Sequence, residues 1–497
     1  MIDNAKLIRS SLWLTASQIS NTFISFLISI IIIKSLNVDQ YADYGIIISY
    51  SMGLTMFSFL GIPNIIQRYL PEKMIGKSYE EIISILISGF YLRAIAILVL
   101  LLVTVLVVLI FHIQTIKNIW ILSIVVLLYV GGKSFFVIVE EGLNALKKQK
   151  VLFNIKTFAS AAKLLTIITI LFFSGLNIYI LLLVLGLYDL IGAVIAILFL
   201  IKTFRVKFSL RISSFYKFNK THIQFGFYNY LSQLQHFILS HSFEIIIISL
   251  ILSKNIVAEY TFSITIATIL SGLFPISAVV KALYPLSIEK YYETNSKTGL
   301  NDFLGEFTSF IAVIYSVLTV FVIMNIDWII KILGKEEYLN TSSVIIVLFL
   351  LSLFSILATP LKIGLIILED AKSLFKSNLS FIPVLFLMPL SAYYFGINGI
   401  LMIAFFSLLS IILMRAYYLR KRLRENLIKK HNVKILAILL TFTLTAITLN
   451  YVIDEMLLKL VLSLLFAGLV ILLYKSMDLV PEMLMEFLSF FKVKVPE

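Results

Sequence analysis

Apolar runs of about 18–28 residues recur along the whole chain, separated by short polar segments. A helix of about 20 apolar residues crosses the ~30 Å hydrocarbon core of a bilayer. The pattern therefore predicts an all-α integral membrane protein with fourteen transmembrane helices and both termini in the cytoplasm. The expected spans are 11–33, 41–65, 82–111, 118–139, 152–174, 178–201, 223–252, 258–285, 303–331, 341–367, 374–395, 398–418, 433–452 and 457–474.

Polar side chains recur every three or four residues in the seventh expected span, whereas Phe, Ile and Leu fill its other positions. They are Asn229, Gln233, His236, Ser240 and Glu244. Residues at this spacing share one face of an α-helix. Polar groups at membrane depth are costly unless they face water or a polar partner. This stripe predicts that the helix lines a wet cavity.

A matching stripe occurs in the first expected span. Gln18, Asn21, Ser25 and Ser29 stand 215 residues before Gln233, His236, Ser240 and Glu244. Two helices with matching polar faces, one from each half, are expected of a transporter whose halves enclose a substrate path. The expected cavity-lining residues are Gln18, Asn21, Ser25, Gln233, His236 and Ser240.

Three further landmarks repeat in the same order and indicate a duplication. The pairs are Ala42-Asp43-Tyr44 with Ala258-Glu259-Tyr260, Gly142-Leu143 with Gly364-Leu365, and Gly175-Leu176-Asn177 with Gly396-Ile397-Asn398. One period covers six helices, so the two copies form parallel repeats with the same membrane orientation. The predicted parts are an N-terminal six-helix half (1–201), a basic cytoplasmic linker (202–222), a C-terminal six-helix half (223–420), two extra transmembrane helices (421–475) and a cytoplasmic amphipathic tail (476–497).

Composition excludes several classes of protein. The 497 residues are 60% hydrophobic and 14% charged, whereas soluble proteins are about 45–50% apolar and 25% charged. No long segment has soluble composition, so we expect no catalytic domain, no enzymatic activity and no cofactor. Cysteine is absent, and the loop histidines lack metal-ligand spacing, so we expect no metal site.

The net charge is +14, and the distribution of the positive charges along the chain reflects the orientation of the protein in the membrane. With the N-terminus inside, most Lys and Arg lie in segments expected to be cytoplasmic, as the positive-inside rule requires. We therefore expect no nucleic-acid partner. The basic loop 202–222 suits a topology anchor that attracts anionic membrane lipids, with substrate capture as the alternative.

Several short motifs resemble a known family. They are the hairpin 35–45, Gly61-Ile62, Arg68-Tyr69, the segment 141–146 and the segment 395–399. Together they resemble the polysaccharide-biosynthesis (O-antigen and exopolysaccharide repeat-unit) flippases of the multidrug/oligosaccharidyl-lipid/polysaccharide exporter superfamily. Asn37 departs from the pattern, since the family usually has Gly there. The resemblance implies a cytoplasmic (inner) membrane protein that flips undecaprenyl-diphosphate-linked oligosaccharides outward. Its partners would be this polyprenyl-diphosphate-linked glycan and a glycan polymerase and glycosyltransferases of the same pathway.

Charged residues inside the spans suit this substrate. A charge at mid-bilayer costs about 2.5–3.5 kcal/mol on insertion scales. The deep charges expected within the spans are nevertheless five cations, Arg93, Lys133, Lys163, Lys281 and Lys362, against two anions, Asp189 and Glu244. An ion pair between Lys163 and Asp189 would leave surplus positive charge for a lipid diphosphate. The residues expected to bind the diphosphate are Arg68, Arg93, Lys133, Lys163, Lys281 and Lys362.

Other roles stay open for some of these cations. Lys281 and Lys362 lie in the inner third of their spans, where a lysine can snorkel to the surface. Arg68 suits a headgroup contact or an interface anchor.

Three residues are candidates for coupling to an ion gradient: Glu244, Asp189 and His241. Cavity lining or simple ion pairing are the alternatives for the two acids. Pro71 and Pro285 close corresponding hairpins of the two halves, so they are the hinge candidates.

Two other functions stay open. A cation-coupled multidrug exporter of the same superfamily would prefer an acidic and aromatic lining, for which Glu244 is the best candidate. A non-transporting membrane scaffold or receptor fits the repeat and the polar stripes less well.

Overall fold

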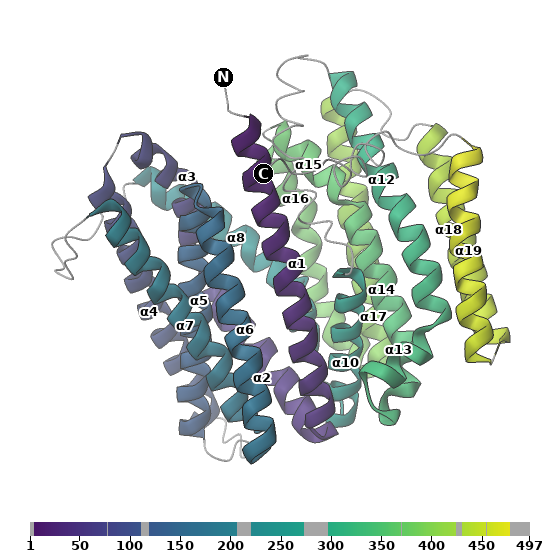
Figure 1. Ribbon diagram of the computed structural model, residues 1–497, viewed down its shortest axis with the longest axis horizontal. Coiled ribbons are helices and arrows are strands. Elements are labelled where there is room, and N and C mark those ends of the chain that lie inside the picture. Colours follow the sequence, from purple (N-terminus) through teal and green to yellow (C-terminus); the bar gives the residue numbers. More distant parts are fainter. Residues whose placement is uncertain are drawn as a thin grey trace, which may run out of the picture. The chain divides into compact units, whose positions relative to one another are not determined.

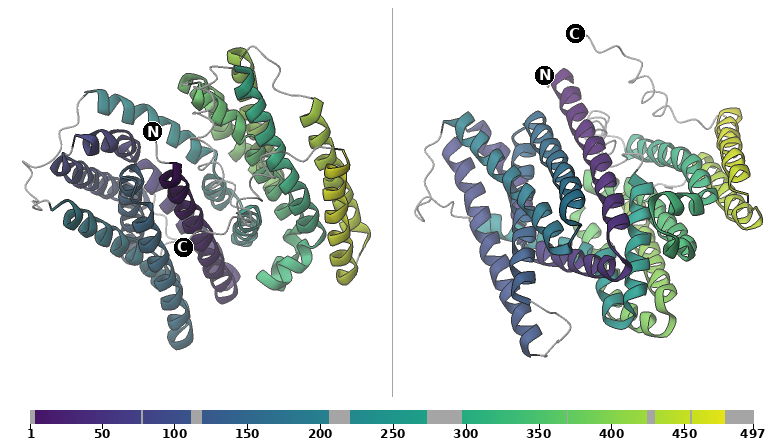
Figure 2. Two further views of the ribbon diagram at one scale, coloured as in Figure 1. Left: turned by 45° about the horizontal axis from the view of Figure 1, so that its top comes forward. Right: turned by 60° about the horizontal axis from the view of Figure 1, so that its bottom comes forward.

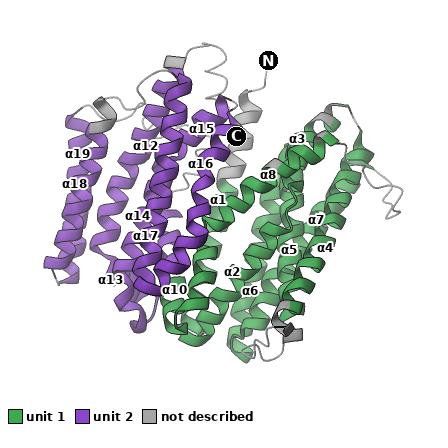
Figure 3. Ribbon diagram, turned by 180° about the vertical axis from the view of Figure 1, so that it is seen from behind, with its two compact units in different colours: residues 1–261 green, residues 262–497 purple. Residues whose placement is uncertain are grey.

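The computed structural model describes residues 4–76, 78–110, 119–205, 220–272, 297–368, 370–423, 430–453 and 455–477. The described residues form helices and turns and contain no strand, which confirms the all-α prediction (Figure 1). The chain forms two compact units, residues 1–261 and 262–497 (Figure 3). Lys281, Pro285, most of the predicted linker and the predicted tail beyond residue 477 lie outside the described residues.

The first unit contains nine helices of the described part and the start of a tenth. They are α1 (Asn4–Ser35), α2 (Val38–Phe57), α3 (Ile62–Ile75), α4 (Tyr79–Ile110), α5 (Ile119–Ala145), α6 (Gln149–Ser174), α7 (Ile178–Phe204), α8 (Lys220–Ile238), α9 (His241–Ile251) and α10 (Lys254–Gly272). Local side chains fix some of their ends. Asn37 and Gln40 form a reciprocal capping box at the start of α2, with bonds of 2.8 and 3.1 Å.

The second unit is built around α12. Its elements after α10 are α12 (Lys297–Met324), α13 (Ile326–Leu333), η2 (Glu336–Thr341), α14 (Ser342–Leu357), α15 (Thr359–Ile367), α16 (Ala371–Ser377), η3 (Asn378–Ser380), α17 (Phe381–Leu423), α18 (Lys430–Val452) and α19 (Met456–Ser476). The helices α18 and α19 pack beside α12 (Figures 1 and 2). Ser316 and Tyr474, 2.9 Å apart, link α12 to α19.

Ten helices of the described part are long and apolar enough to cross a membrane, or up to twelve if each of two bent pairs is one span. The run 372–423 counts as one of them, but 52 residues in a straight helix would be about 78 Å long. Gly396, with φ 58°, interrupts it between the expected spans 374–395 and 398–418. The protein is therefore a multi-pass helical membrane protein, and the count of fourteen spans stays a prediction.

Two expected spans are broken. The α2–α3 pair bends by 50° and the α8–α9 pair by 51°. The prediction of one continuous helix over 223–252, with a single polar face, is therefore wrong. Ser240 has extended backbone angles, and its hydroxyl donates to the Phe237 carbonyl at 2.6 Å. Such local bonds compete with helical ones.

The repeated landmarks have the same local geometry in both copies. The amide of Leu146 bonds to Gly142 O at 3.0 Å, and 222 residues later Leu368 bonds to Gly364 O at 3.1 Å. Gly175 and Gly396 both have positive φ, at 72° and 58°, in a region that glycine adopts most easily. These agreements support the duplication, whereas the domain limits predicted from it stay a proposal.

Close helix packing in the first unit depends on small residues. A Cβ atom on Gly132 of α5 would collide with the backbone of Gly186 on α7, and one on Gly186 would lie 2.5 Å from Tyr129 Cα. Small residues allow such close approach between membrane helices. This contact holds α5, which carries Lys133, against α7, which carries Asp189.

Candidate functional site

Arg93 lies on α4 and is fully buried. Its Nη1 donates to the Ser134 carbonyl oxygen of α5 at 2.7 Å, and its guanidinium carbon lies 4.2 Å from the Phe59 ring centroid. Its Nε and Nη2 have no hydrogen-bond partner in the described part of the chain. Arg93 is therefore a buried cation with unused donors, enclosed by protein rather than lining an open cavity.

Lys133 on α5 is half-buried. Its Nζ lies 3.8 Å from the Met52 sulfur and 5.7 Å from the Tyr129 ring centroid. The charge of Asp189 attracts it at longer range. The side chains of Met52 and Tyr129 are uncharged partners, so among the described residues no carboxylate is in direct contact with the Lys133 ammonium group.

The predicted ion pair between Lys163 and Asp189 is present, joining α6 to α7. Both side chains are largely buried, at 14% and 19% exposure. A second polar contact, between Thr166 and Tyr188 at 2.7 Å, links the same helices. Asp189 is therefore engaged as an ion-pair partner in this structure.

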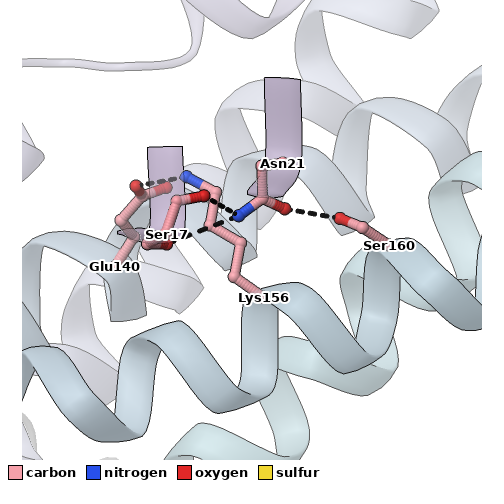
Figure 4. A network of polar contacts seen from close by, with 5 residues as sticks. All are labelled: Ser17, Asn21, Glu140, Lys156 and Ser160. Carbon is pink, nitrogen blue, oxygen red and sulfur yellow. Dashed lines mark hydrogen bonds and ion pairs between the residues drawn. The ribbon is translucent and has the colours of Figure 1, made fainter. Parts of the chain in front are cut away.

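The polar face of α1 contacts α6 (Figure 4). Asn21 accepts a hydrogen bond of 2.7 Å from the Ser160 hydroxyl and donates to the Ser17 carbonyl at 2.6 Å. Gln18 is half-buried and Ser25 is exposed. Beside this network, Lys156 of α6 forms an ion pair of 2.7 Å with Glu140 of α5.

The polar residues of α8 contact α3 instead. Gln233 donates to Asn64 Oδ1 at 2.9 Å, and Asn64 donates to Asn229 Oδ1 at 3.3 Å. His236 is exposed, and Ser240 stands at the helix break. The stripes of α1 and α8 thus use different neighbours. The spacing of polar residues did not predict a role for Asn64. It lies near the end of the expected span 41–65, outside either polar stripe.

Glu244 in the first turn of α9 is buried, with 4% exposure. Its Oε2 accepts a hydrogen bond of 3.0 Å from Tyr260 of α10 and lies 2.6 Å from His241 Nδ1. The predicted neighbours Glu244 and His241 therefore form one cluster with Tyr260. Tyr260 was not among the predicted site residues. The signal available for it was the repeat, in which Tyr260 corresponds to Tyr44.

Arg68 and Lys362 have other surroundings. Arg68 on α3 is exposed, with its guanidinium carbon 5.7 Å from the Tyr69 ring centroid. Lys362 lies on α15 of the second unit, where α15 packs against α17. The hinge candidate Pro71 lies inside α3, whereas the sharp bend lies between Phe57 and Ile62. Among the described residues of the first unit, the predicted cations have separate partners and do not form one cluster.

The described residues contain no group of three or more His, Asp and Glu side chains that could hold a metal ion. The candidate site is therefore a set of cations, amides and one buried carboxylate. Such groups bind anions and hydroxyl-rich molecules through hydrogen bonds and charge.

Comparison with protein families identifies a match over residues 7–290 to the family described as "Polysaccharide biosynthesis protein". This match covers more than half of the chain. The chain belongs to this family. The family match runs from within α1 through α10, so it includes Arg93, Lys133, Lys163 and Glu244. The family resemblance predicted from the short motifs is confirmed.

Solved structures show the fold of this polysaccharide biosynthesis protein. The lipid II flippase MurJ, in an inward closed conformation, is similar with a TM-score of 0.61 and 17% identity, covering 95% of this chain and 98% of that chain. An inward-facing multidrug resistance MATE family transporter of the MOP superfamily has a TM-score of 0.58 and 16% identity, covering 81% and 94%.

A third similar structure is a MOP superfamily transporter from Pyrococcus furiosus, described as having a binding pocket of reverse polarity. Its TM-score is 0.55 at 13% identity, covering 84% of this chain and 95% of that chain. A search of curated proteins gives no match. At these identities the likeness establishes the fold, which is that of MOP-superfamily transporters.

Proposed function

We propose that this protein is a flippase for undecaprenyl-diphosphate-linked oligosaccharide repeat units, which it moves from the inner to the outer leaflet of the cytoplasmic membrane. Its family is one of polysaccharide biosynthesis, and a structural neighbour is a lipid II flippase. Glycosyltransferases would supply the lipid-linked substrate, and a glycan polymerase would consume it. The protein binds and moves the substrate without changing its covalent structure.

The observation that carries this proposal is the surplus of positive charge inside the first unit. Lys163 has the carboxylate of Asp189 as its partner. Arg93 and Lys133 are held instead by a carbonyl, a thioether and aromatic rings. In the described residues neither of these two cations contacts a carboxylate. Unpaired cations in a low-dielectric interior attract a diphosphate and repel an organic cation.

The alternative, a cation-coupled multidrug exporter, would bind its cationic substrate on a free acidic group in the transport path. The two deep acids of the first unit are engaged, Asp189 by Lys163 and Glu244 by His241 and Tyr260. The Pyrococcus furiosus neighbour illustrates that this fold also occurs with a pocket described as reversed in polarity. The charge pattern favours the flippase.

The amide groups of α8 and α3 suit the glycan. Asn64, Asn229 and Gln233 form a connected set of hydrogen bonds, and Gln233 Oε1 is buried without a partner in the described part. Carboxamides donate and accept at once, which matches sugar hydroxyls. Gln18 and Asn21 would offer the same chemistry from α1.

Movement of the broken helices would expose the buried cation. Phe59, which covers Arg93, belongs to the break between α2 and α3. A change in the 50° bend would shift this ring and uncover the guanidinium. We place this bend, together with Pro71, in the alternating-access movement of the halves 1–201 and 223–420.

The proposal is tested by the flipping of a fluorescent undecaprenyl-diphosphate-linked oligosaccharide in proteoliposomes. Wild-type protein should move the probe between leaflets, and the double variant Arg93→Ala/Lys133→Ala, which removes the two cations without a carboxylate partner, should lose most of this activity. Unimpaired flipping by the double variant would refute the cationic site. Resistance of expressing cells to cationic dyes, without restored glycan export in a flippase-deficient strain, would favour the multidrug exporter.

A further inference from the structure

The two copies of the repeat differ in charge at one matched position. In the first unit, Glu140 at the end of α5 pairs with Lys156 of α6 at 2.7 Å (Figure 4). The residues 222 positions later are Lys362 on α15 and Asn378 in η3. The matched backbone bonds at Gly142 and Gly364 fix this register. The second copy therefore has a cation where the first has an acid.

Arg415 of α17 adds a second positive charge at this position. Its Nη2 donates to Asn378 Oδ1 at 3.1 Å. The helices α15 and α17 pack closely, since Gly364 lacks a side chain where Leu419 approaches. Lys362 and Arg415 are near enough for their charges to repel each other. The first unit thus has a neutral ion pair at this place, and the second has two cations.

The two cations have unused binding capacity. Both side chains are half-buried, and the Nε atom of Arg415 is buried without a hydrogen-bond partner in the described part of the chain. Neither cation forms an ion pair among the residues described. Asp370, which follows α15, is already bonded to Arg422 at 2.6 Å and to the amide of Ser373 at 3.1 Å. Like charges held together away from water are costly unless an anion joins them.

We infer that Lys362, Arg415 and Asn378 form a second anion site, which binds the diphosphate headgroup of the polyprenyl lipid before it crosses the membrane. This inference rests on the proposed function, because a lipid diphosphate is its substrate. A guanidinium group binds phosphate oxygens through paired donors, and a lysine adds a point charge. The diphosphate carries more negative charge than the single phosphodiester of an ordinary phospholipid.

The place of the site in the membrane suits capture of the substrate. Arg415 lies one to two turns before Arg420, Lys421 and Arg422, which end α17. Such a basic cluster marks the cytoplasmic side by the positive-inside rule. Lipid-linked glycans assembled at the inner leaflet present their headgroups at this depth. This site gives Lys362 a role in substrate binding, as an alternative to snorkelling to the membrane surface.

Binding of sugar-free undecaprenyl diphosphate to the full-length protein tests this inference. The affinity would be measured in nanodiscs of a zwitterionic lipid, with phosphatidylglycerol as a competitor. Lys362→Glu restores the acid of the first copy and offers a partner to Arg415, so the fold should persist while affinity falls at least tenfold. Lys156→Gln removes one positive charge at the matched position of the first copy and should change affinity less than twofold.

The possible outcomes distinguish failure of this site from failure of the proposed function. Equal affinity in wild type and Lys362→Glu, or an equal loss in Lys156→Gln, would overturn the site. Equally strong competition by phosphatidylglycerol would assign the two cations to a bulk phospholipid and also overturn it. If undecaprenyl diphosphate binds as expected but wild-type protein fails to flip the oligosaccharide probe, the site stands and the proposed flippase function fails.

Discussion

The hydroxyl of Tyr260 donates a hydrogen bond of 3.0 Å to the buried carboxylate of Glu244. The same carboxylate oxygen lies 2.6 Å from His241 Nδ1, and the His241 side chain is 38% exposed. One end of the cluster therefore reaches the protein surface and the other is enclosed. This arrangement can pass a proton from an imidazole to a buried carboxyl group, so it suits coupling of transport to a proton gradient.

We propose that Glu244 couples transport to a proton gradient. Replacement of Glu244 by Gln should then remove the coupling and leave the fold intact. A carboxamide can still accept from Tyr260, but it cannot take up a proton. We expect Glu244→Gln to flip the oligosaccharide probe with no dependence on an imposed pH gradient. Flipping in proteoliposomes with and without the gradient measures this. The same gradient dependence in Glu244→Gln and wild type would reduce Glu244 to a structural role.

Breaking the ion pair of α6 and α7 should destabilise the first unit. Asp189→Asn leaves the largely buried Lys163 without its counter-charge, at a cost of roughly 1–3 kcal/mol. The double variant Asp189→Asn/Lys163→Gln removes both charges and should recover much of this loss. Thermal unfolding in detergent compares the three proteins. A double variant less stable than Asp189→Asn would contradict a simple charge pair.

Two adjacent glycines of α5 provide a matched pair of substitutions. A Cβ atom on Gly132 would strike the backbone of Gly186, whereas one on Gly131 meets nothing within 4 Å. Gly132→Ala should therefore cost about 1–3 kcal/mol through overpacking. Gly131→Ala should be neutral or gain up to about 1 kcal/mol through helix propensity. Equal melting temperatures for the two variants would contradict the close α5–α7 packing.

Acid should weaken the second unit through Asp370. The hydrogen bond from Arg422, together with those from Ser373, lowers the pKa of the Asp370 carboxyl below its ordinary value of 3.8. The folded state therefore favours the charged form. The stabilisation is complete above about pH 4 and is lost as the pH falls through the lower folded-state pKa. Melting temperatures between pH 3 and pH 6 should show this loss in wild type, and Arg422→Gln should reduce it.

The predicted orientation can be tested without removing any native thiol, because the chain has no cysteine. Thr221→Cys and Leu427→Cys lie in segments expected to face the cytoplasm. A membrane-impermeant maleimide should label both only after the membrane is permeabilised. Labelling of either residue in intact cells would reverse or break the fourteen-span topology.

Local features of the fold could be predicted from the sequence. The apolar runs gave the helical membrane class, and the repeated glycines gave the matched turns at Gly175 and Gly396. The Lys163–Asp189 pair was also predictable, because a short turn brings consecutive helices together. In each case the determining residues are close in the chain or recur at a fixed offset.

Features that depend on distant contacts could not be predicted. The spacing of Ser240 places it on the polar face of one continuous helix. In the structure its hydroxyl bonds to the Phe237 carbonyl, and the helix is broken there between α8 and α9. The burial of Arg93 depends on Phe59 and Ser134, which come from other helices. Asn64 was missed because its amide role depends on the approach of α8 to α3. Periodicity gives the face of a helix, but not the neighbour which that face meets.

The break at Ser240 also bears on how the protein enters the membrane during synthesis. The 11 residues of α9 rise only about 16 Å, so they cannot cross the bilayer alone. The helix α8 carries amides that disfavour its insertion into lipid. The bond that Gln233 donates to Asn64 and the bond that Asn64 donates to Asn229 offset that cost only if α3 is already in place. Because α3 is translated first, we expect the N-terminal helices to aid insertion of this segment.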